Sequence, residues 1–470
     1  MKFNFKNIAL LCLLFVLAQP LHAQVSLGGV LNHNAVVQRD RVLPVWGTAR
    51  DGEHIEVEFA GQRVTTVAKG GRWLVRLSPL PASGPFNLVI TGEHDLLTLT
   101  NILVGDVWLV SGQSNMQMPV KECDNSEQEC LSVDHPNLRL CTVKKGWNGQ
   151  PQTHAEASWR LCSPDAARDF SAVGYFFASE LLKDSSLTNV PIALVDSSVG
   201  GTMCEAWIPQ TALNQFDTNM LHDSMFGIKP AMLYNSMIAP LGQTPFTGVI
   251  WYQGEGNAGH PADYPKLLST LIGEWRQQFK QPRLPFFVVQ LPDYVPDWGG
   301  YYWTWIREAQ AKTARAVPNT SLILGIETTD GTNLHPKQKL EIGRRAALQA
   351  RHVVYHENII STGPVFKRAQ VKGATVKVTF ITGGNGLVCN STNGLSGFAV
   401  AGVDGVYHPA SGRIDGDNVI VQSDLVPKPK TVRYAWSGVP NSTLRNQAGL
   451  PAAPFRTDEL PYDRVQPPKN

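Results

Sequence analysis

The stretch Gly105-Asp-Val-Trp-Leu-Val-Ser-Gly-Gln-Ser114-Asn-Met decides how this chain folds. Its apolar run from Val107 to Val110 is rich in β-branched residues, which predicts a buried strand. The run stops at a turn-prone Ser-Gly-Gln-Ser cluster, so Ser114 is expected on a tight turn just beyond the strand. A nucleophilic serine needs this placement, although a simple capping serine has the same local pattern.

Strand and helix patterns alternate from about residue 103 onward. Strands are expected at 104–110, 191–195, 248–252, 285–290 and 321–326, and helices at 172–183, 232–238, 264–279, 303–316 and 338–352. This alternation predicts an α/β fold in which a parallel sheet carries helices on both faces, giving three layers.

The regions on either side of this α/β part are β-rich. Five short apolar runs separated by glycine turns between residues 24 and 100 predict a small β-sandwich, and four more runs follow residue 355. The expected organisation is therefore a sandwich at 24–102, an α/β domain at 103–355 and a β-rich segment at 356–470.

Residues 1–23 have the features of a cleaved signal peptide. Lys2 and Lys6 precede an apolar core from Ile8 to Ala18 that is too short to span a bilayer, and small residues end at Ala23. Cleavage after Ala23 would release an exported protein, periplasmic or extracellular. No later segment has some 18 consecutive apolar residues, so no membrane span is expected.

Six of the seven cysteines remain after residue 23. An even number in an oxidising compartment permits disulfides, and the spacing suggests Cys123–Cys130 and Cys141–Cys162, although spacing alone does not fix connectivity. No cysteine or histidine spacing resembles a zinc site, so neither a metal nor another cofactor is expected. The formal net charge of +2, with no dense basic run, argues against nucleic-acid binding.

Polar residues follow four of the expected strands, at the edge where their carboxyl ends meet. They are Ser114, the pair Gly200 and Gly201, the amides Gln253 and Asn257, and His335. Acyl transfer needs this set, because a histidine must take the serine proton and two or three donors must stabilise the oxyanion. The expected donors are the N–H of Ser114, a glycine N–H from the pair, and one of the two side-chain amides.

These residues resemble the SGNH-hydrolase superfamily and, within it, the sialate O-acetylesterase family of carbohydrate esterases. The resemblance covers essentially the whole mature chain and rests on GDVWLVSGQSNMQMPV, the Gly-Gly-Thr block that continues to Glu205-Ala-Trp207, LYNSMIAPL with GVIWYQGEGN, WIREAQ and HPKQKLEIGRRAAL. It implies an SGNH-type hydrolase domain with Ser114 as nucleophile, His335 as base and Gln253 as a side-chain oxyanion donor.

The chain departs from this family at the acid that orients the histidine. The acid often stands three residues before the histidine, where this chain has Thr332, and Asn333 stands two before it. Asp330 is the nearest acid and either folds back onto His335 or caps the following turn. A backbone carbonyl that holds the imidazole, leaving a Ser–His dyad, is the alternative to a triad.

Three further residues are candidates for sugar contact. Arg307 on a predicted helix either meets an acidic or sugar substrate or forms a salt bridge within the scaffold. Trp207 and Tyr252, near strand ends, either stack on a sugar face or pack in the core.

The leading hypothesis is an exported serine esterase that removes O-acetyl groups from a carbohydrate, with sialic acid as the substrate that names the family. Alternatives are an acetylesterase of xylan or another plant polysaccharide, and a carbohydrate-binding protein without catalysis. The partner in each case is an O-acetylated sugar or glycan, while the sequence leaves the oligomeric state open.

Overall fold

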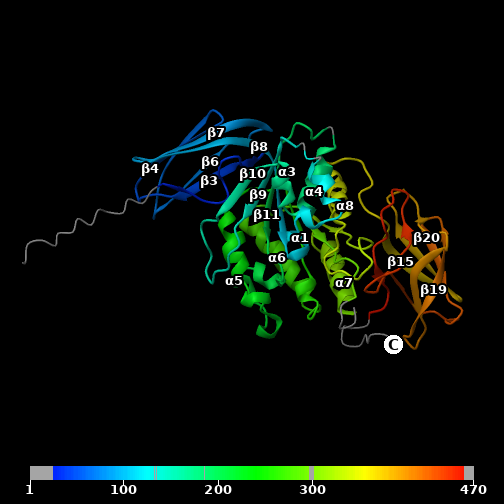
Figure 1. The fold of residues 1–470 in the computed structure, drawn as a ribbon. Coiled ribbons are helices and arrows are strands. Elements are labelled where there is room, and N and C mark those ends of the chain that lie inside the picture. The colour runs from blue at the N-terminus through cyan, green and yellow to red at the C-terminus, as the bar shows by residue number, and fades with distance from the viewer. Residues whose placement is uncertain (1–24, 132, 134, 185, 296–300, 460–470) are drawn as a thin grey trace, which may run out of the picture.

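A parallel β-sheet forms the centre of the protein, in a computed structural model that describes residues 25–131, 133, 135–184, 186–295 and 301–459 (Figure 1). Six of its strands run parallel in the order β9-β11-β8-β12-β13-β14, and β10 pairs antiparallel with β9 at one edge. Their bounds are β8 (Leu96–Gly112), β9 (Leu138–Val143), β10 (Ala157–Leu161), β11 (Ile192–Ser198), β12 (Gly248–Tyr252), β13 (Phe286–Val289) and β14 (Thr320–Ile323). Each of the five predicted strands of the α/β part is confirmed.

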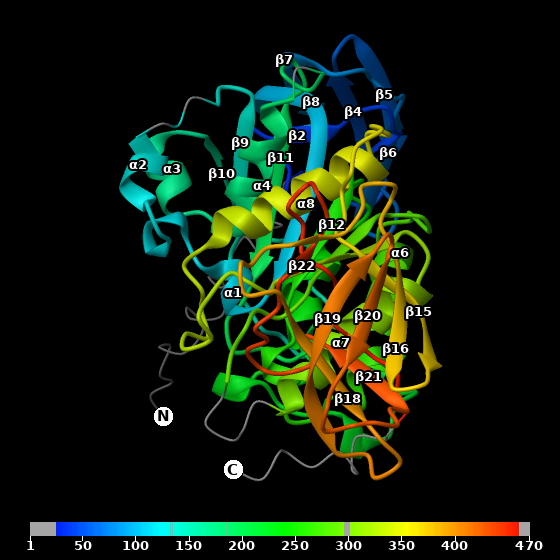
Figure 2. The ribbon, with the colours of Figure 1, turned by 90° about the vertical axis from the view of Figure 1, so that its right-hand side faces the viewer.

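Helices cover this sheet on both faces. The helices are α1 (Ser114–Gln117), α2 (Ser126–Leu131), α3 (Pro164–Arg168), α4 (Ala172–Leu182), α5 (Gln210–Leu213), α6 (Tyr264–Gln278), α7 (Tyr301–Ala316) and α8 (Lys339–Val353). Helix α4 packs against α8, and α6 packs against α7. Right-handed crossovers place these two pairs on opposite faces, and Figure 2 shows α8 crossing in front of the strands. The α/β class with parallel strands is thus confirmed.

Short helical turns occupy several of the connections. Six are 3₁₀ turns: η1 (Val120–Glu122), η2 (Cys204–Trp207), η3 (Thr218–Met220), η4 (Met225–Gly227), η6 (Ala239–Leu241) and η7 (Glu255–Asn257). The helix predicted at 232–238 is instead the π-helical turn η5 (Tyr234–Ile238). Four of these turns, η1, η2, η4 and η7, contribute to the loops around the carboxyl ends of the strands.

The N-terminal strands join the central sheet through one long strand. They are β1 (Ser26–Leu27), β2 (Val36–Gln38), β3 (Leu43–Thr48), β4 (His54–Phe59), β5 (Gln62–Val67), β6 (Arg72–Leu77) and β7 (Ser83–Thr91). Strands β1, β3 and β6 form a separate sheet, whereas β7 and β2 pair with the first half of β8. Because β8 runs unbroken through residue 102, one strand crosses the expected domain boundary, and a single hydrophobic cluster extends from Val25 to Ala350.

The C-terminal region is an antiparallel sheet with its own core. Seven strands lie in the order β15-β16-β20-β19-β18-β21-β23, and β17 pairs with β22. Their bounds are β15 (Val365–Lys372), β16 (Thr375–Ile381), β17 (Val388–Cys389), β18 (Leu395–Ala401), β19 (Tyr407–Asp415), β20 (Asn418–Gln422), β21 (Thr431–Tyr434), β22 (Leu444–Arg445) and β23 (Phe455–Arg456). The buried side chains of these strands form a second hydrophobic cluster, separate from the first. Figures 1 and 2 show it beside α7 and α8.

The two expected disulfides are wrong in this structure, where the cysteines of both pairs are free thiols. For Cys141 and Cys162 the strand register gives the reason. Cys141 on β9 lies opposite Trp159, whereas the Cys162 N–H donates to the carbonyl of Leu138. Three residues along a strand span about 10 Å, which is too far for a disulfide.

The carboxyl ends of three adjacent strands lie level with one another. Gly112 of β8 is the register partner of both Ser198 on β11 and Tyr252 on β12. Gly112 has φ 138°, and a Cβ added there would lie 2.1 Å from the Tyr252 carbonyl oxygen. Only glycine therefore allows β8 to end this close to β12, which sets where the following turn begins.

We expect Gly112→Ala to lower the free energy of unfolding by at least about 2 kcal/mol, because it adds backbone strain and a clash with main-chain atoms. Urea unfolding followed by circular dichroism measures the change. The matched control is Gly273→Ala on α6, where an added Cβ meets no atom within 4 Å. That control is expected to be stabilising by about 0.5–1 kcal/mol; equal stability of the two variants would contradict the argument.

Candidate active site

Ser114 and His335 meet at the carboxyl end of the parallel sheet. Ser114 begins α1, the short helix that follows β8, and His335 lies in the loop between β14 and α8. The Oγ of Ser114 and the Nε2 of His335 are 2.8 Å apart, which is hydrogen-bonding distance. The structure thus brings together the two residues that sequence reasoning paired across more than two hundred positions.

Three features set the charge state of His335. Burial lowers the pKa of the imidazole, the nearby ammonium of Lys339 lowers it further, and the carboxylate of Glu122 raises it. Glu122 lies on η1, whose neighbour Asp124 donates its N–H to the Lys337 carbonyl at 3.2 Å. The net direction is downward, so the imidazole is neutral at pH 7 and Nε2 can accept a proton.

The structure corrects the expectation that Asp330 orients His335. Its Oδ1 accepts hydrogen bonds from the Thr332 N–H at 3.0 Å and from the Thr332 hydroxyl at 2.7 Å. These bonds hold an exposed turn and lower the pKa of Asp330. Within the described residues, the Nδ1 of His335 has neither a carboxylate nor a backbone carbonyl at hydrogen-bonding distance, so the proposed carbonyl partner is also absent.

A buried polar cluster lies directly beneath the two site residues, and its centre is Asn115. The Asn115 Nδ2 donates to Glu255 Oε1 at 2.5 Å and to the Leu334 carbonyl at 3.0 Å, while its Oδ1 accepts from Lys339 Nζ at 2.5 Å. Burial lowers the pKa of Lys339 to about 8 and raises the pKa of Glu255. The bond to Leu334 connects the residue after Ser114 to the residue before His335.

Sequence reasoning missed the roles of Asn115, Lys339 and Glu122. The first two stand inside the motif blocks quoted above, next to Ser114 and four residues after His335. A lysine at the fourth position after a histidine, at the start of a helix, was the signal available for Lys339. No pattern pointed to Glu122, because its proximity to His335 arises only from the fold.

Both predicted side-chain amides are fully used inside the protein. The Gln253 Nε2 donates to the Thr202 carbonyl and to Asn257 Oδ1, at 3.0 and 2.8 Å. The Asn257 Nδ2 donates to Glu205 Oε2 at 2.8 Å. Neither side chain is more than 1% exposed. The expectation that either amide points at an oxyanion is therefore corrected: both hold loops together.

The two glycines after β11 approach Ser114 closely. A Cβ on Gly200 would lie 3.3 Å from the Cβ of Ser114, and Gly201 has φ 72°. The Gly200 N–H donates to Gln117 Oε1 at 2.8 Å. Among the described residues, the N–H groups of Ser114 and Gly201 have no acceptor, so backbone donors, unlike the side-chain amides, remain near the serine.

The three residues expected to contact sugar are buried, which corrects that expectation. Trp207 and Tyr252 are 0% exposed, and the Trp207 Nε1 donates to Thr202 Oγ1 at 3.1 Å. Arg307 is 2% exposed and pairs with Asp293 at 3.1 Å. Its guanidinium also donates to the Ser437 and Gly438 carbonyls, so it joins α7 to the C-terminal region instead of meeting a substrate.

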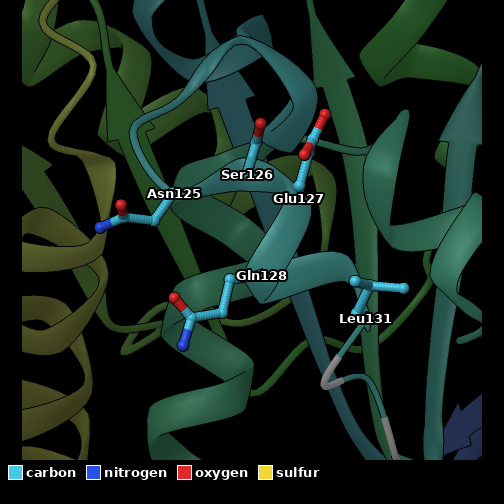
Figure 3. Close-up of a pocket in the computed structure, with 5 residues that line it drawn as sticks. All are labelled: Asn125, Ser126, Glu127, Gln128 and Leu131. Atoms are coloured by element: carbon cyan, nitrogen blue, oxygen red, sulfur yellow. The ribbon is translucent and has the colours of Figure 1, made fainter.

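A large open hollow lies elsewhere, over α2. Its volume is about 780 Å³ and it is lined by Asn125, Ser126, Glu127, Gln128 and Leu131. Figure 3 shows these side chains projecting in different directions from α2 and from Asn125 just before it, with no shared point of approach. Nothing in this arrangement competes with the Ser114–His335 pair as a reaction centre.

The described residues also contain neither a cluster of metal ligands nor a membrane-crossing helix. No three histidine, cysteine, aspartate or glutamate side chains gather there as metal ligands. None of the helices in that part of the chain combines the length and the apolar character needed to cross a membrane. The predicted signal peptide at 1–23 lies outside the described residues.

Comparison with known proteins identifies the family of this chain. The family model described as carbohydrate esterase, sialic acid-specific acetylesterase, matches residues 104–351. The chain belongs to this family. Among solved structures, this esterase resembles a carbohydrate acetylesterase from Xanthomonas citri, with 39% identity, a TM-score of 0.87 and coverage of 93% of this chain and 100% of the other.

Curated relatives of the esterase include two mammalian enzymes. The sialate O-acetylesterase of Mus musculus is 29% identical over 399 residues, covering 70% of this chain and 73% of the mouse protein. The Homo sapiens sialate O-acetylesterase is 28% identical over 386 residues and covers 73% of each chain. The esterase assignment, predicted from the motif blocks, is therefore confirmed.

The effect of the neighbouring charges on the pKa of His335 can be tested in solution. We expect the pKa of His335 in the esterase to lie below 6.5, to fall further in Glu122→Gln, which removes a negative charge, and to rise in Lys339→Met, which removes a positive one. Histidine NMR titration measures these values, with the His335 signal assigned by its loss in His335→Ala.

Glu127→Gln on α2 is the matched control for Glu122→Gln, because Glu127 is an exposed carboxylate that does not act on His335. Equal His335 titration in these two glutamine variants would show that Glu122 has no influence. A downward shift in Lys339→Met would contradict the sign assigned to the buried ammonium.

Proposed function

We propose that this carbohydrate esterase hydrolyses O-acetyl esters on sugars, with sialic acids as the leading substrate, Ser114 as nucleophile and His335 as general base. The observation that carries the proposal is the 2.8 Å contact between Ser114 Oγ and His335 Nε2 at the strand ends. In a member of an acetylesterase family, this contact supports serine acyl transfer.

The proposed reaction has two halves. His335 Nε2 takes the Ser114 proton as Oγ bonds to the acetyl carbon, and the collapse of the tetrahedral intermediate transfers that proton to the departing sugar oxygen. A water molecule, deprotonated by His335, then attacks the acetyl-enzyme, and Ser114 leaves with the proton. Products are the free sugar hydroxyl and acetate. Since burial keeps His335 neutral, the base is ready at pH 7.

We propose that backbone N–H groups stabilise the oxyanion. Ser114 and Gly201 have N–H groups without an acceptor, and the Gly200 N–H already binds an amide oxygen, Gln117 Oε1. In the proposed mechanism the acyl oxygen replaces Gln117 Oε1 as the acceptor of the Gly200 N–H. Removing one such donor in other enzymes costs about 2.7–4 kcal/mol of barrier.

Several broader features belong to the same proposal. The sheet is of the SGNH type, with a β-sandwich at 24–102, a hydrolase domain at 103–355 and a β-rich region at 356–470. The chain is exported after cleavage of a signal peptide at Ala23. The order of the parallel strands, with Ser114 after β8 and His335 after the last of them, supports the SGNH assignment.

We expect Ser114→Ala to lower kcat for acetate release by at least about a thousandfold, because the nucleophile is removed while the buried cluster beneath it stays. Acetate release from a chromogenic acetate ester measures the loss. The melting temperature should match that of the unaltered protein, since Ser114 is only half-buried. Turnover near the original rate would remove Ser114 from the mechanism.

Asp330→Asn distinguishes a dyad from a triad. We expect a decrease in kcat of less than about tenfold, or roughly 1.4 kcal/mol, because the Asp330 carboxylate bonds to Thr332. A triad acid would cost up to about 10⁴-fold. His335→Ala, assayed beside it, should be inactive. A loss beyond about a hundredfold in a folded Asp330→Asn protein would mean that Asp330 acts in catalysis.

The substrate is tested by product analysis. Mono-O-acetylated sialic acids and acetylated xylo-oligosaccharides are incubated side by side with the protein and with Ser114→Ala, and released acetate and the position of each lost acetyl group are measured. Release from sialic acids supports the leading proposal, and release from xylan fragments alone favours the plant-polysaccharide alternative. Binding of either sugar with no release by the unaltered protein would favour a binding protein.

A further inference from the structure

A surface loop beside Ser114 carries an aromatic ring that the proposed mechanism does not use. The loop spans residues 224–228 and includes η4 (Met225–Gly227), and the side chain of Phe226 at its tip is 78% exposed. Met225, next to it, is 62% exposed. A large apolar ring left in water loses about 1.5–3 kcal/mol of possible burial, so such exposure is costly when it has no partner.

The backbone of Phe226 is also strained. Its φ of 61° and ψ of 21° lie in the left-handed region, which bulky side chains seldom adopt. Gly227, which follows, has φ 70°. Strain of about 1–3 kcal/mol at one residue persists only where surrounding contacts enforce it, and it is concentrated at functional sites.

The contacts that enforce this conformation lie at the base of the loop. The Ser224 N–H donates to the Ile228 carbonyl at 2.8 Å and closes the loop, while the Ser224 Oγ accepts from the Met203 N–H at 2.8 Å. Ser224 and Ile228 are both buried. The two ends of the loop are thus fixed to the protein while its aromatic tip projects outward.

The loop contacts the glycine pair that lies next to the nucleophile. The Met225 N–H donates to the Gly201 carbonyl at 3.0 Å, and a Cβ on Gly201 would be 2.9 Å from the Met225 sulfur. On the other side, Gly200 approaches the Cβ of Ser114. Gly200 and Gly201 are consecutive, so the Met225–Phe226 loop packs against the residue that follows the nucleophile's closest glycine neighbour.

From these observations we infer that Phe226 is the platform on which the sugar ring carrying the acetyl ester packs. The inference rests on the proposed function, since Ser114 must be where the ester reacts. The C–H face of a pyranose ring is apolar and matches an aromatic face, while its hydroxyls remain in water. Trp207 and Tyr252, the aromatic residues expected to do this, are buried.

The platform is tested by comparing two esters in the same variants. One is the O-acetylated sugar turned over fastest in the product analysis, and the other is ethyl acetate, which has no ring to stack. We expect Phe226→Ala to lower the ratio of kcat/KM for the sugar ester to kcat/KM for ethyl acetate by about tenfold, mainly through KM for the sugar. Alanine retains the Cβ and hence the same backbone constraint.

Two controls accompany this variant. Phe226→Trp, which keeps an aromatic face, should retain most of the ratio. Val403→Ala, at an 89% exposed apolar residue of the C-terminal region, should leave both rates unchanged. Melting temperatures show whether each variant is folded. A ratio in Phe226→Ala equal to that of the unaltered protein overturns the platform, including the case in which both rates fall together.

Failure of the proposed function gives a different result. If the unaltered protein releases acetate from ethyl acetate but from no acetylated sugar, both the proposed substrate class and the platform are wrong. If it hydrolyses the sugar ester and Ser114→Ala does not, while the ratio is insensitive to Phe226, only the platform is wrong.

Discussion

The hydrogen bonds of one buried side chain, Asn115, hold the candidate site together. Asn115 follows Ser114 and is 0% exposed, and its amide bonds to Glu255, to the Leu334 carbonyl and to Lys339. These partners come from the loop after β12, the loop that bears His335 and the first turn of α8. Leaving the buried Asn115 amide unpaired would be costly, so its hydrogen bonds favour one arrangement of the three segments. Ser114 and His335 are positioned by it.

The same cluster sets the electrostatics of the base. Lys339 and Glu255 are both buried, and Asn115 bonds to each of them. Charge in a protein interior is weakly screened, so the buried Lys339 ammonium lowers the pKa of His335. The exposed Glu122 carboxylate acts in the opposite direction and raises it. An imidazole without a carboxylate partner can thus serve as a base, since a general base must be neutral before it reacts.

At the strand ends, the buried polar side chains hold the loops in place and do not face a substrate. Gln253, Asn257 and Glu205 form hydrogen bonds with one another or with backbone and hold the loops after β11 and β12 in place. Arg307 does the same between α7 and the C-terminal region. The groups left facing a substrate are backbone N–H groups and exposed loop side chains, which agrees with the general placement of binding residues on loops supported by a rigid sheet.

The sequence by itself determined the α/β class, five of the six parallel strands and the pairing of Ser114 with His335. Apolar periodicity and the rule that parallel strand ends share an edge are local or topological properties. Tertiary structure decided the rest. Whether Trp207, Tyr252 and Arg307 face solvent depends on packing between distant segments, and Asp330 bonds to Thr332 because a nearby turn reaches it first. Likewise Glu122 approaches His335 only through chain folding, which no local pattern encodes.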